Sequence, residues 1–221
     1  MVQKKIANFA NMTDKQLIKE IARLSGETPT AIRRLLRNDN KQREAHDFYA
    51  THPSCSADLL KVESFNKNVC DPCAGGGHLM QAFEANGYNV IASDLINRGY
   101  GIGGVDFLSE DFNSLLTVPV DFVINPPYKL LLPFIKKCLE LTNNKVAVLM
   151  PLRYLSGKER SQFFKEKPPK VVYVYVNRIN MAKNGDFEKY QKTTNMETYA
   201  WVVWEKGYKG ATTLKWLINI I

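Results

Sequence analysis

The sequence predicts an α/β protein in which a mostly parallel sheet carries helices on both faces, with a small helical unit ahead of it. From about residue 47 onward, short apolar runs alternate with helical patterns, which is the rhythm of a parallel sheet. A glycine-rich segment joins the first run to a helical pattern. The last two runs have no clear helix between them, so we expect a C-terminal antiparallel hairpin on the sheet.

The expected elements follow one another in chain order. Strands are predicted at residues 68–70, 89–93, 122–125, 146–150, 171–176 and 200–204. Helices are predicted at residues 56–62, 79–85, 131–141 and 158–164. Three tryptophans are expected to be core or sheet-face aromatics: Trp201, Trp204 and Trp216.

Residues 1–46 are predicted to form a helical unit and linker, separate from a main domain at residues 47–221. Residues 14–38 split into two short helical patterns, and residues 39–46 are polar. The pattern is similar to a helix-turn-helix unit, which needs a small residue, a tight turn and two core contacts, here Ala22, Gly26, Ile32 and Leu35. We expect either a DNA-contacting unit or a plain helical hairpin packed on the main domain.

Composition narrows the class of protein. The chain is 45% hydrophobic and 24% charged, which are ordinary globular values. No apolar run is long enough to span a bilayer, and the N-terminus has no apolar core of a signal peptide. Four cysteines in 221 residues do not make a disulfide scaffold. We therefore expect a cytoplasmic protein with no membrane partner.

The net charge of +8 is distributed unevenly along the chain. Lys and Arg outnumber Asp and Glu by 10 to 5 in residues 1–46 and by 13 to 6 in residues 151–221, but they number 7 against 11 in residues 47–150. Two basic ends around an acidic middle favour a polyanionic partner, of which nucleic acid is the usual one. Ordinary solvated lysines are the alternative.

The segment after the first predicted strand, DPCAGGGHL, indicates a ligand loop. Glycines at 75–77 allow close backbone approach, and Asp94 follows Asp71 by 23 residues, where an acid that holds ribose hydroxyls is expected. The sequence holds no P-loop motif, and Asp71 would repel a pyrophosphate. Asp71 instead favours a cationic group, so an adenosine ligand that carries an amino acid fits. The alternative is that Asp71 and Asp94 are simple strand-end or capping residues with no ligand.

The third predicted strand stops at Asn125-Pro126-Pro127-Tyr128. Prolines cannot donate to a sheet, so the strand must end there. A proline-rich turn would explain the prolines, but it does not call for an amide and an aromatic ring beside them.

These motifs together resemble the class I S-adenosylmethionine-dependent methyltransferases over residues 47–205. They are most similar to enzymes that methylate amino groups of nucleic acids and carry an [DNS]PP[YFW] motif, and among these to small phage and bacterial DNA adenine-N6 methylases. The resemblance implies a Rossmann-like fold with a mostly parallel seven-stranded sheet, S-adenosylmethionine as cofactor, and the cytoplasm of a bacterial or phage-infected cell.

The resemblance implies roles for ten cofactor-binding residues. Tyr49 and Thr51 would help to hold the methionine end, and the glycine loop with Asp71 and Cys73 would surround the methionine and sugar. Asp94 would hold the ribose, while Leu95, Asp106 and Phe107 would contact the adenine. The ten are Tyr49, Thr51, Asp71, Cys73, Gly75, Gly77, Asp94, Leu95, Asp106 and Phe107.

The catalytic residues implied by the resemblance are Asn125, Pro126, Pro127 and Tyr128. The Asn125 oxygen and the Pro126 carbonyl would accept the hydrogens of an exocyclic amine, most readily adenine N6 of DNA, while Tyr128 stacks on the flipped base. The alternatives are an RNA adenine-N6 methyltransferase, a cytosine-N4 DNA methyltransferase, or a non-catalytic module that binds S-adenosylmethionine and DNA.

Nine residues are candidates for nucleic-acid contacts, and no metal is expected. The candidates are Thr30, Arg33, Arg34, Arg37, Arg153, Lys158, Arg160, Arg178 and Lys183; for the last five, ordinary solvated side chains are the alternative. The Cys70–Cys73 pair could suggest zinc, but a second ligand pair is missing and the histidines are scattered.

Overall fold

The computed structural model describes residues 49–179, 181–183, 187 and 197–218, with residues 18, 19, 22, 23 and 28 nearer the N-terminus; Tyr49 and Lys183 are described by their backbone alone. The chain divides into two units, Met1–Asp47 and Phe48–Ile221. In the first, residues 18, 19, 22 and 23 are helical and Ala22 is buried. The rest of the predicted helix-turn-helix lies outside the described residues.

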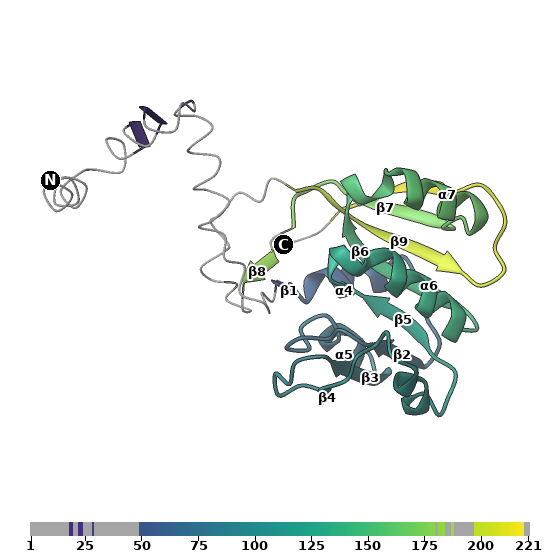
Figure 1. Cartoon of the computed structure of the whole chain (residues 1–221). Coiled ribbons are helices and arrows are strands. Elements are labelled where there is room, and N and C mark those ends of the chain that lie inside the picture. The colour runs from purple at the N-terminus through teal and green to yellow at the C-terminus, as the bar shows by residue number, and fades with distance from the viewer. Residues whose placement is uncertain are drawn as a thin grey trace, which may run out of the picture. The chain divides into compact units, whose positions relative to one another are not determined.

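An eight-stranded sheet forms the centre of the second unit (Figure 1). Its order is β10-β7-β9-β6-β5-β2-β3-β4, and every neighbouring pair is parallel except those that β9 makes with β6 and β7. The strands are β2 (Asn68–Asp71), β3 (Asn89–Asp94), β4 (Ile102–Gly103), β5 (Asp121–Ile124), β6 (Lys145–Pro151), β7 (Val171–Tyr175), β9 (Tyr199–Glu205) and β10 (Thr213–Leu217). A separate antiparallel pair joins β1 (Tyr49–Thr51) and β8 (Met181–Lys183).

The six predicted strands are confirmed, and so is the antiparallel pairing of the last two, β7 with β9. The sheet has eight strands and not the predicted seven: β4 and β10 both lie outside the six predicted ranges, and β10 pairs parallel to β7 at the sheet edge. Four of the five β10 residues are exposed, among them the large apolar Leu214 and Trp216, so burial gives no guide to its place at the edge. Trp201 and Trp204 are buried in the core, whereas Trp216 on this strand is 68% exposed, so of the two expected places, core or sheet face, only the sheet face remains for it.

Helices cover both faces of the sheet, as the sequence predicts. The helices α4 (Ser54–Leu60) and α5 (Gln81–Ala85) pack on one face, and α6 (Leu131–Leu141) and α7 (Lys158–Glu166) pack on the other. Three short 3-10 helices join them: η1 (Glu110–Leu115), η2 (Tyr128–Leu130) and η3 (Leu152–Leu155). The result is a three-layer α/β/α arrangement (Figure 1).

The core divides into one apolar cluster on each side of the sheet because successive strand side chains point to opposite faces. In β5, Val123 joins the cluster beneath α4 and α5, while Phe122 and Ile124 join the cluster beneath α6. All four residues of β5 are buried, which is typical of a central parallel strand covered on both sides.

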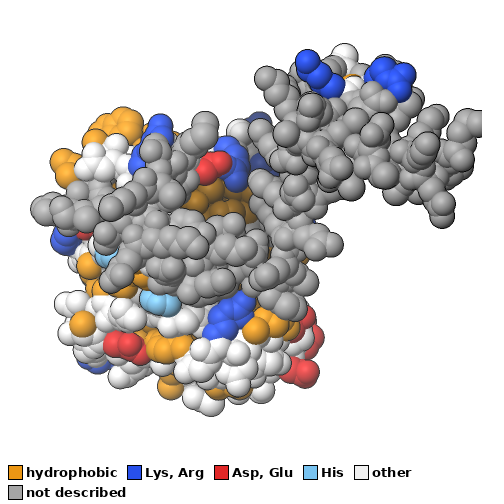
Figure 2. All heavy atoms as spheres, turned by 90° about the vertical axis from the view of Figure 1, so that its left-hand side faces the viewer, with side chains coloured by type: hydrophobic (Ala, Val, Ile, Leu, Met, Phe, Trp, Pro, Cys, Tyr) orange, Lys and Arg blue, Asp and Glu red, His pale blue; other side chains and the backbone are white. Residues whose placement is uncertain are grey.

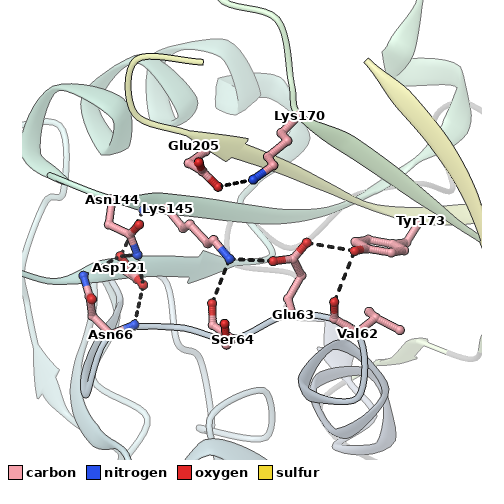
Figure 3. A network of polar contacts seen from close by, with 10 residues as sticks. All are labelled: Val62, Glu63, Ser64, Asn66, Asp121, Asn144, Lys145, Lys170, Tyr173 and Glu205. Carbon is pink, nitrogen blue, oxygen red and sulfur yellow. Dashed lines mark hydrogen bonds and ion pairs between the residues drawn. The ribbon is translucent and has the colours of Figure 1, made fainter. Parts of the chain in front are cut away.

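A polar network covers the end of the sheet at which β5 and β6 begin (Figure 3). The Asp121 carboxylate is fully buried and accepts hydrogen bonds from the Asn66 backbone at 2.6 Å, the Asn144 amide at 2.8 Å and the Lys145 backbone at 3.0 Å. Lys145 Nζ pairs with Glu63 at 2.7 Å. These bonds tie the starts of β2, β5 and β6 together, at the opposite end of the strands from the residues discussed next.

Candidate functional site

The candidate site lies at the carboxyl ends of β3, β2 and β5, three adjacent parallel strands. The chain runs from β2 toward β3 and β4 on one side and returns to build β5 and β6 on the other. The connections after β2 and β5 therefore leave in opposite directions, and such a switch point is where open α/β sheets bind ligands. The loops that follow β2 and β5 begin with Pro72 and Asn125.

Asp94 joins the loops after β2 and β3. One carboxylate oxygen, Oδ2, accepts the Gly75 backbone N–H at 2.8 Å, and the other, Oδ1, accepts the Ile96 backbone N–H at 2.8 Å. A second bond between the loops runs from the Ala74 backbone N–H to the Ser93 carbonyl at 3.0 Å. The glycine loop and the acidic strand end, which the sequence predicts to share a ligand, are thus in direct contact.

Asp71 ends β2 and is 1% exposed. Its Oδ1 accepts hydrogen bonds from the Cys73 backbone at 3.0 Å and from the Cys73 thiol at 3.4 Å. Burial, with a smaller contribution from the Asp94 charge, raises the pKa of the Asp71 carboxyl to about 7, although the hydrogen bonds from Cys73 act in the opposite direction. Burial also raises the pKa of the Cys73 thiol well above its ordinary value, so the thiol stays protonated and donates. A cationic group beside Asp71 would stabilise its ionised form.

The glycine loop requires glycine at positions 75 and 77. Gly75 and Gly77 have φ angles of 56° and 80°, in the region that side chains disfavour. A Cβ on Gly77 would also lie 2.5 Å from the ring of Tyr100. The Tyr100 hydroxyl donates to Glu84 at 2.7 Å and so holds its ring against the loop. Tyr100 was not predicted, because nothing local in the sequence links it to Gly77.

The three residues predicted to contact the adenine differ in their exposure. Leu95 is 59% exposed, and Asp106 is exposed, with its Oδ1 accepting the Leu108 backbone N–H at 2.9 Å. Phe107 is only 2% exposed, and its ring packs 4.7 Å from that of Phe112. Phe107 is therefore a core residue in this structure, and we correct its predicted role to packing beneath the loop.

The segment 125–128 leaves the end of β5 at the switch point. Asn125 is half-buried, Pro126 is buried, and Pro127 is exposed. The Asn125 Nδ2 donates to Thr51 Oγ1 at 2.8 Å, and the Asn125 Oδ1 accepts from the Tyr128 hydroxyl at 2.8 Å. Thr51 is 4% exposed and belongs to β1, so the contact joins segments that are 74 residues apart. The amide is held at both ends.

Tyr128 is half-buried and lies among other tyrosines. Its ring centroid is 5.1 Å from that of Tyr154, with the planes tilted by 38°. Burial raises the pKa of Tyr128 well above its ordinary value, and Tyr199 beside it raises the pKa further, so the hydroxyl remains a donor at neutral pH. Neither Tyr154 nor Tyr199 was singled out from the sequence, since each lies on another strand end or loop.

Two of the predicted phosphate-contacting arginines meet at Tyr154. The Arg153 and Arg160 guanidinium carbons lie 5.0 Å and 5.2 Å from the Tyr154 ring centroid. Arg153 also pairs with Glu197, and Arg160 donates to the carbonyls of Tyr154 and Ser156 at 2.9 Å. Arg160 therefore stabilises the loop that contains Tyr154 and Ser156 through these hydrogen bonds.

The other residues predicted to contact nucleic acid are either exposed or outside the described residues. Lys158 and Arg178 are exposed. Thr30, Arg33, Arg34 and Arg37 lie outside the described residues, as do the side chains of Tyr49 and Lys183. On the face seen in Figure 2, the basic side chains of the described residues are scattered among hydrophobic and uncharged ones.

A second aromatic contact lies near the site. The ring of Phe187 lies 5.0 Å from that of His52 and 5.3 Å from that of His78. His52 follows Thr51 directly, and His78 follows the glycine loop. Burial lowers the pKa of His78, and His52 lowers it further. The contact links the segments on either side of the glycine loop to the chain beyond β8.

Within the part of the chain that the structure describes, no three His, Cys, Asp or Glu side chains are grouped so that they could hold a metal ion. No helix among the described residues has the length and apolar character needed to cross a membrane. All four cysteines are described, and each is a free thiol.

No family model matches the sequence, and a search of curated proteins finds no match. Solved structures do match. An assigned class I S-adenosylmethionine-dependent methyltransferase from Listeria monocytogenes aligns with TM-score 0.50 and 16% identity over 74% of this chain and 62% of its own. A predicted O-methyltransferase from Agrobacterium tumefaciens aligns with TM-score 0.51 and 13% identity over 77% and 86%.

The modification subunit of an assigned type I restriction enzyme from Vibrio vulnificus aligns with TM-score 0.50 and 12% identity. It covers 91% of this chain, but this chain spans only 51% of it, and likewise only 62% of the Listeria protein. At these identities the likeness concerns the fold. The chain has the Rossmann-like fold of class I methyltransferases, as the sequence predicts.

Proposed function

We propose that this protein is an S-adenosylmethionine-dependent methyltransferase that acts on an exocyclic amino group of DNA, with adenine N6 as the first choice. The observation that carries the proposal is the position of Asn125-Pro126-Pro127-Tyr128 at the switch point, two strand ends away from Asp94. A half-buried amide held at both ends is suited to present a fixed acceptor.

The residues beside the segment fit the cofactor in their chemistry. Asp94 accepts one backbone N–H on each oxygen, and an ionised carboxylate has further acceptor sites for the ribose hydroxyls. Asp71, whose ionised form burial disfavours, suits the α-ammonium group. When bound, S-adenosylmethionine supplies a methyl group on a positively charged sulfur. The remaining proposed contacts are Tyr49, Cys73, Gly75, Gly77, Leu95 and Asp106, whereas the Thr51 hydroxyl contacts Asn125.

Asn125 and Pro126 would activate the amine. The lone pair of an exocyclic amine is delocalised into the base, which makes the nitrogen a poor nucleophile. Asn125 Oδ1 and the Pro126 carbonyl oxygen would each accept one N–H and draw the nitrogen toward tetrahedral geometry. Pro126 and Pro127 stiffen the segment, which holds both acceptors in place. The surplus proton can leave to solvent after the methyl group has been taken up.

DNA is favoured over a small-molecule substrate by charge and by neighbouring side chains. Both ends of the chain are basic, and Arg153 and Arg160 lie at Tyr154, whose ring packs on Tyr128. A base in a duplex must be flipped out to reach such a segment, and an aromatic ring that stacks on it contributes about 1–3 kcal/mol. The expected helix-turn-helix unit favours DNA over RNA.

The experiment is methylation of defined nucleic acids by the full chain. Unmethylated duplex DNA, the same DNA denatured, and transcribed RNA are incubated with methyl-labelled S-adenosylmethionine, and the nucleosides are identified by mass spectrometry. We expect N6-methyldeoxyadenosine with the wild type and at least a hundredfold less, about 3 kcal/mol in barrier, with Asn125→Ala. Asn113→Ala, at an exposed asparagine on η1, is the matched control and should behave as wild type.

Other products would redirect the proposal. N6-methyladenosine in RNA alone would overturn the assignment to DNA, and N4-methyldeoxycytidine would overturn the assignment to adenine. Measured cofactor binding without any methylated nucleoside would indicate a non-catalytic module that binds S-adenosylmethionine and DNA.

A further inference from the structure

The Asn125 amide is the meeting point of two hydroxyl groups from different parts of the chain. Thr51 Oγ1 accepts from the nitrogen end, Nδ2, and the Tyr128 hydroxyl donates to the oxygen end, Oδ1, both at 2.8 Å. Tyr128 is three residues away in the same segment, whereas Thr51 is 74 residues away on β1. The two contacts therefore differ in how they are anchored.

The anchoring of Thr51 is independent of the segment that it contacts. Thr51 is 4% exposed, and its strand β1 pairs in register with β8, with Thr51 opposite Met181. The α4 helix begins three residues later at Ser54 and packs on the first core cluster through Cys55 and Leu59. Thr51 thus holds the amide from a rigid part of the fold.

The Tyr128 hydroxyl and a substrate amine would use the same acceptor atom, whose two lone pairs can serve both. Under the proposed mechanism the amine must donate to Asn125 Oδ1, which is where the Tyr128 hydroxyl donates in this structure. The terminal torsion of an asparagine is broad, so the direction of Oδ1 depends on the hydrogen bonds that hold the amide. The bond from Nδ2 to Thr51 fixes that direction without using any acceptor capacity of Oδ1.

We propose that Thr51 is a positioning residue that orients the Asn125 amide for its acceptor role, rather than a residue whose main task is to hold the methionine end of the cofactor. The inference rests on the proposed methyl transfer. It assigns to the Thr51 hydroxyl the orientation of one specific atom, Asn125 Oδ1.

Three variants of the full chain test the inference. Thr51→Val removes the hydroxyl and keeps the shape, and Thr51→Ser restores the hydroxyl. Thr142→Val is the matched control, since Thr142 is 2% exposed and its hydroxyl donates to the Val120 carbonyl at 2.8 Å, near the starts of β5 and β6. The probes are unmethylated duplex DNA for kcat and KM, calorimetry for S-adenosylmethionine affinity, and thermal unfolding.

We expect Thr51→Val to lower kcat about tenfold, the effect of one lost hydrogen bond, with KM for DNA and cofactor affinity within about twofold of wild type. Thr51→Ser should recover most of kcat. Thr142→Val should lower the melting temperature without lowering kcat. A wild-type kcat in Thr51→Val overturns the inference, and so does a loss of cofactor affinity as large as the loss of kcat.

A readout without turnover separates this inference from the proposed function. In NMR spectra of the full chain, the side-chain NH2 signal of Asn125, identified by its absence in Asn125→Ala, should exchange slowly with solvent in wild type and at least about fivefold faster in Thr51→Val. Unchanged exchange overturns the inference even if methyl transfer is observed. No methyl transfer by wild type, with the exchange difference present, overturns the proposed function and leaves the contact between Thr51 and Asn125 as orientation of the amide alone.

Discussion

At the scale of single residues, the candidate site is built from polar side chains whose neighbours are already fixed in place. Each carboxylate oxygen of Asp94 accepts one hydrogen bond from a backbone N–H group, and Asp71 accepts hydrogen bonds from the backbone N–H and the thiol of Cys73. Preorganised groups of this kind need little rearrangement when a ligand arrives. The Asp71 carboxyl is buried in this arrangement, and burial disfavours its ionised form.

Cofactor affinity should depend on pH through Asp71, whose pKa burial raises to about 7. A cationic α-ammonium binds the ionised carboxyl, so affinity should be full above pH 7 and fall as pH drops through it, by about tenfold per unit well below. Calorimetric titration of the full chain with S-adenosylmethionine between pH 5.5 and 8.5 measures this. Asp71→Asn should bind weakly and lose the dependence. An unchanged profile in Asp71→Asn would remove Asp71 from the ammonium contact.

At the scale of elements, the two ends of the parallel strands have separate roles: the carboxyl ends carry the candidate site, and the amino ends carry a stabilising polar network. The carboxyl edge carries Asp71, Asp94 and Asn125, while the amino edge is closed by the network around Asp121 (Figure 3). Parallel strands make this separation possible, because all of them end at the same side of the sheet. Stability and ligand binding can therefore be changed independently by substitutions at opposite edges.

Asp121→Ala should lower the free energy of unfolding by about 3 kcal/mol, because it removes a fully buried carboxylate and leaves the donors of Asn66, Asn144 and Lys145 without their acceptor. Urea denaturation measures the loss. Lys170→Met, which breaks the more exposed Lys170–Glu205 pair, is the control and should cost less than about 1 kcal/mol. Equal losses in the two variants would contradict the structural role given to Asp121. Cofactor affinity of the folded Asp121→Ala protein should match wild type.

At the scale of the whole molecule, the chain combines a domain that carries the site with a basic N-terminal unit. The two units, Met1–Asp47 and Phe48–Ile221, differ in charge balance, and residues 1–46 hold 10 Lys and Arg against 5 Asp and Glu. Arg153 and Arg160 are already engaged at Tyr154, Glu197 and loop carbonyls, so under the proposed function we expect the N-terminal arginines to supply further phosphate contacts.

Replacing Arg33, Arg34 and Arg37 together by Gln should reduce the salt dependence of duplex binding, with the slope of log K against log salt shallower by about 0.9 for each lost phosphate contact. Fluorescence anisotropy with a DNA duplex at several salt concentrations measures the slope. The matched control replaces three exposed lysines that lie outside the site by Gln: Lys165, Lys167 and Lys209. If both triple variants keep the wild-type slope, the N-terminal arginines do not contact phosphate.

The sequence by itself determined the strand and helix rhythm, the acids at the ends of β2 and β3, and the segment 125–128, because each is encoded by residues close together in the chain. Other features were decided only by tertiary structure: the hydrogen bond from Asn125 to Thr51, the burial of Phe107, and the edge strand β10 with its exposed Trp216. The physical reason is that periodicity and local chemistry need only a few neighbouring residues. A contact across 74 residues, or the burial of one ring, depends on which strands become neighbours in the sheet.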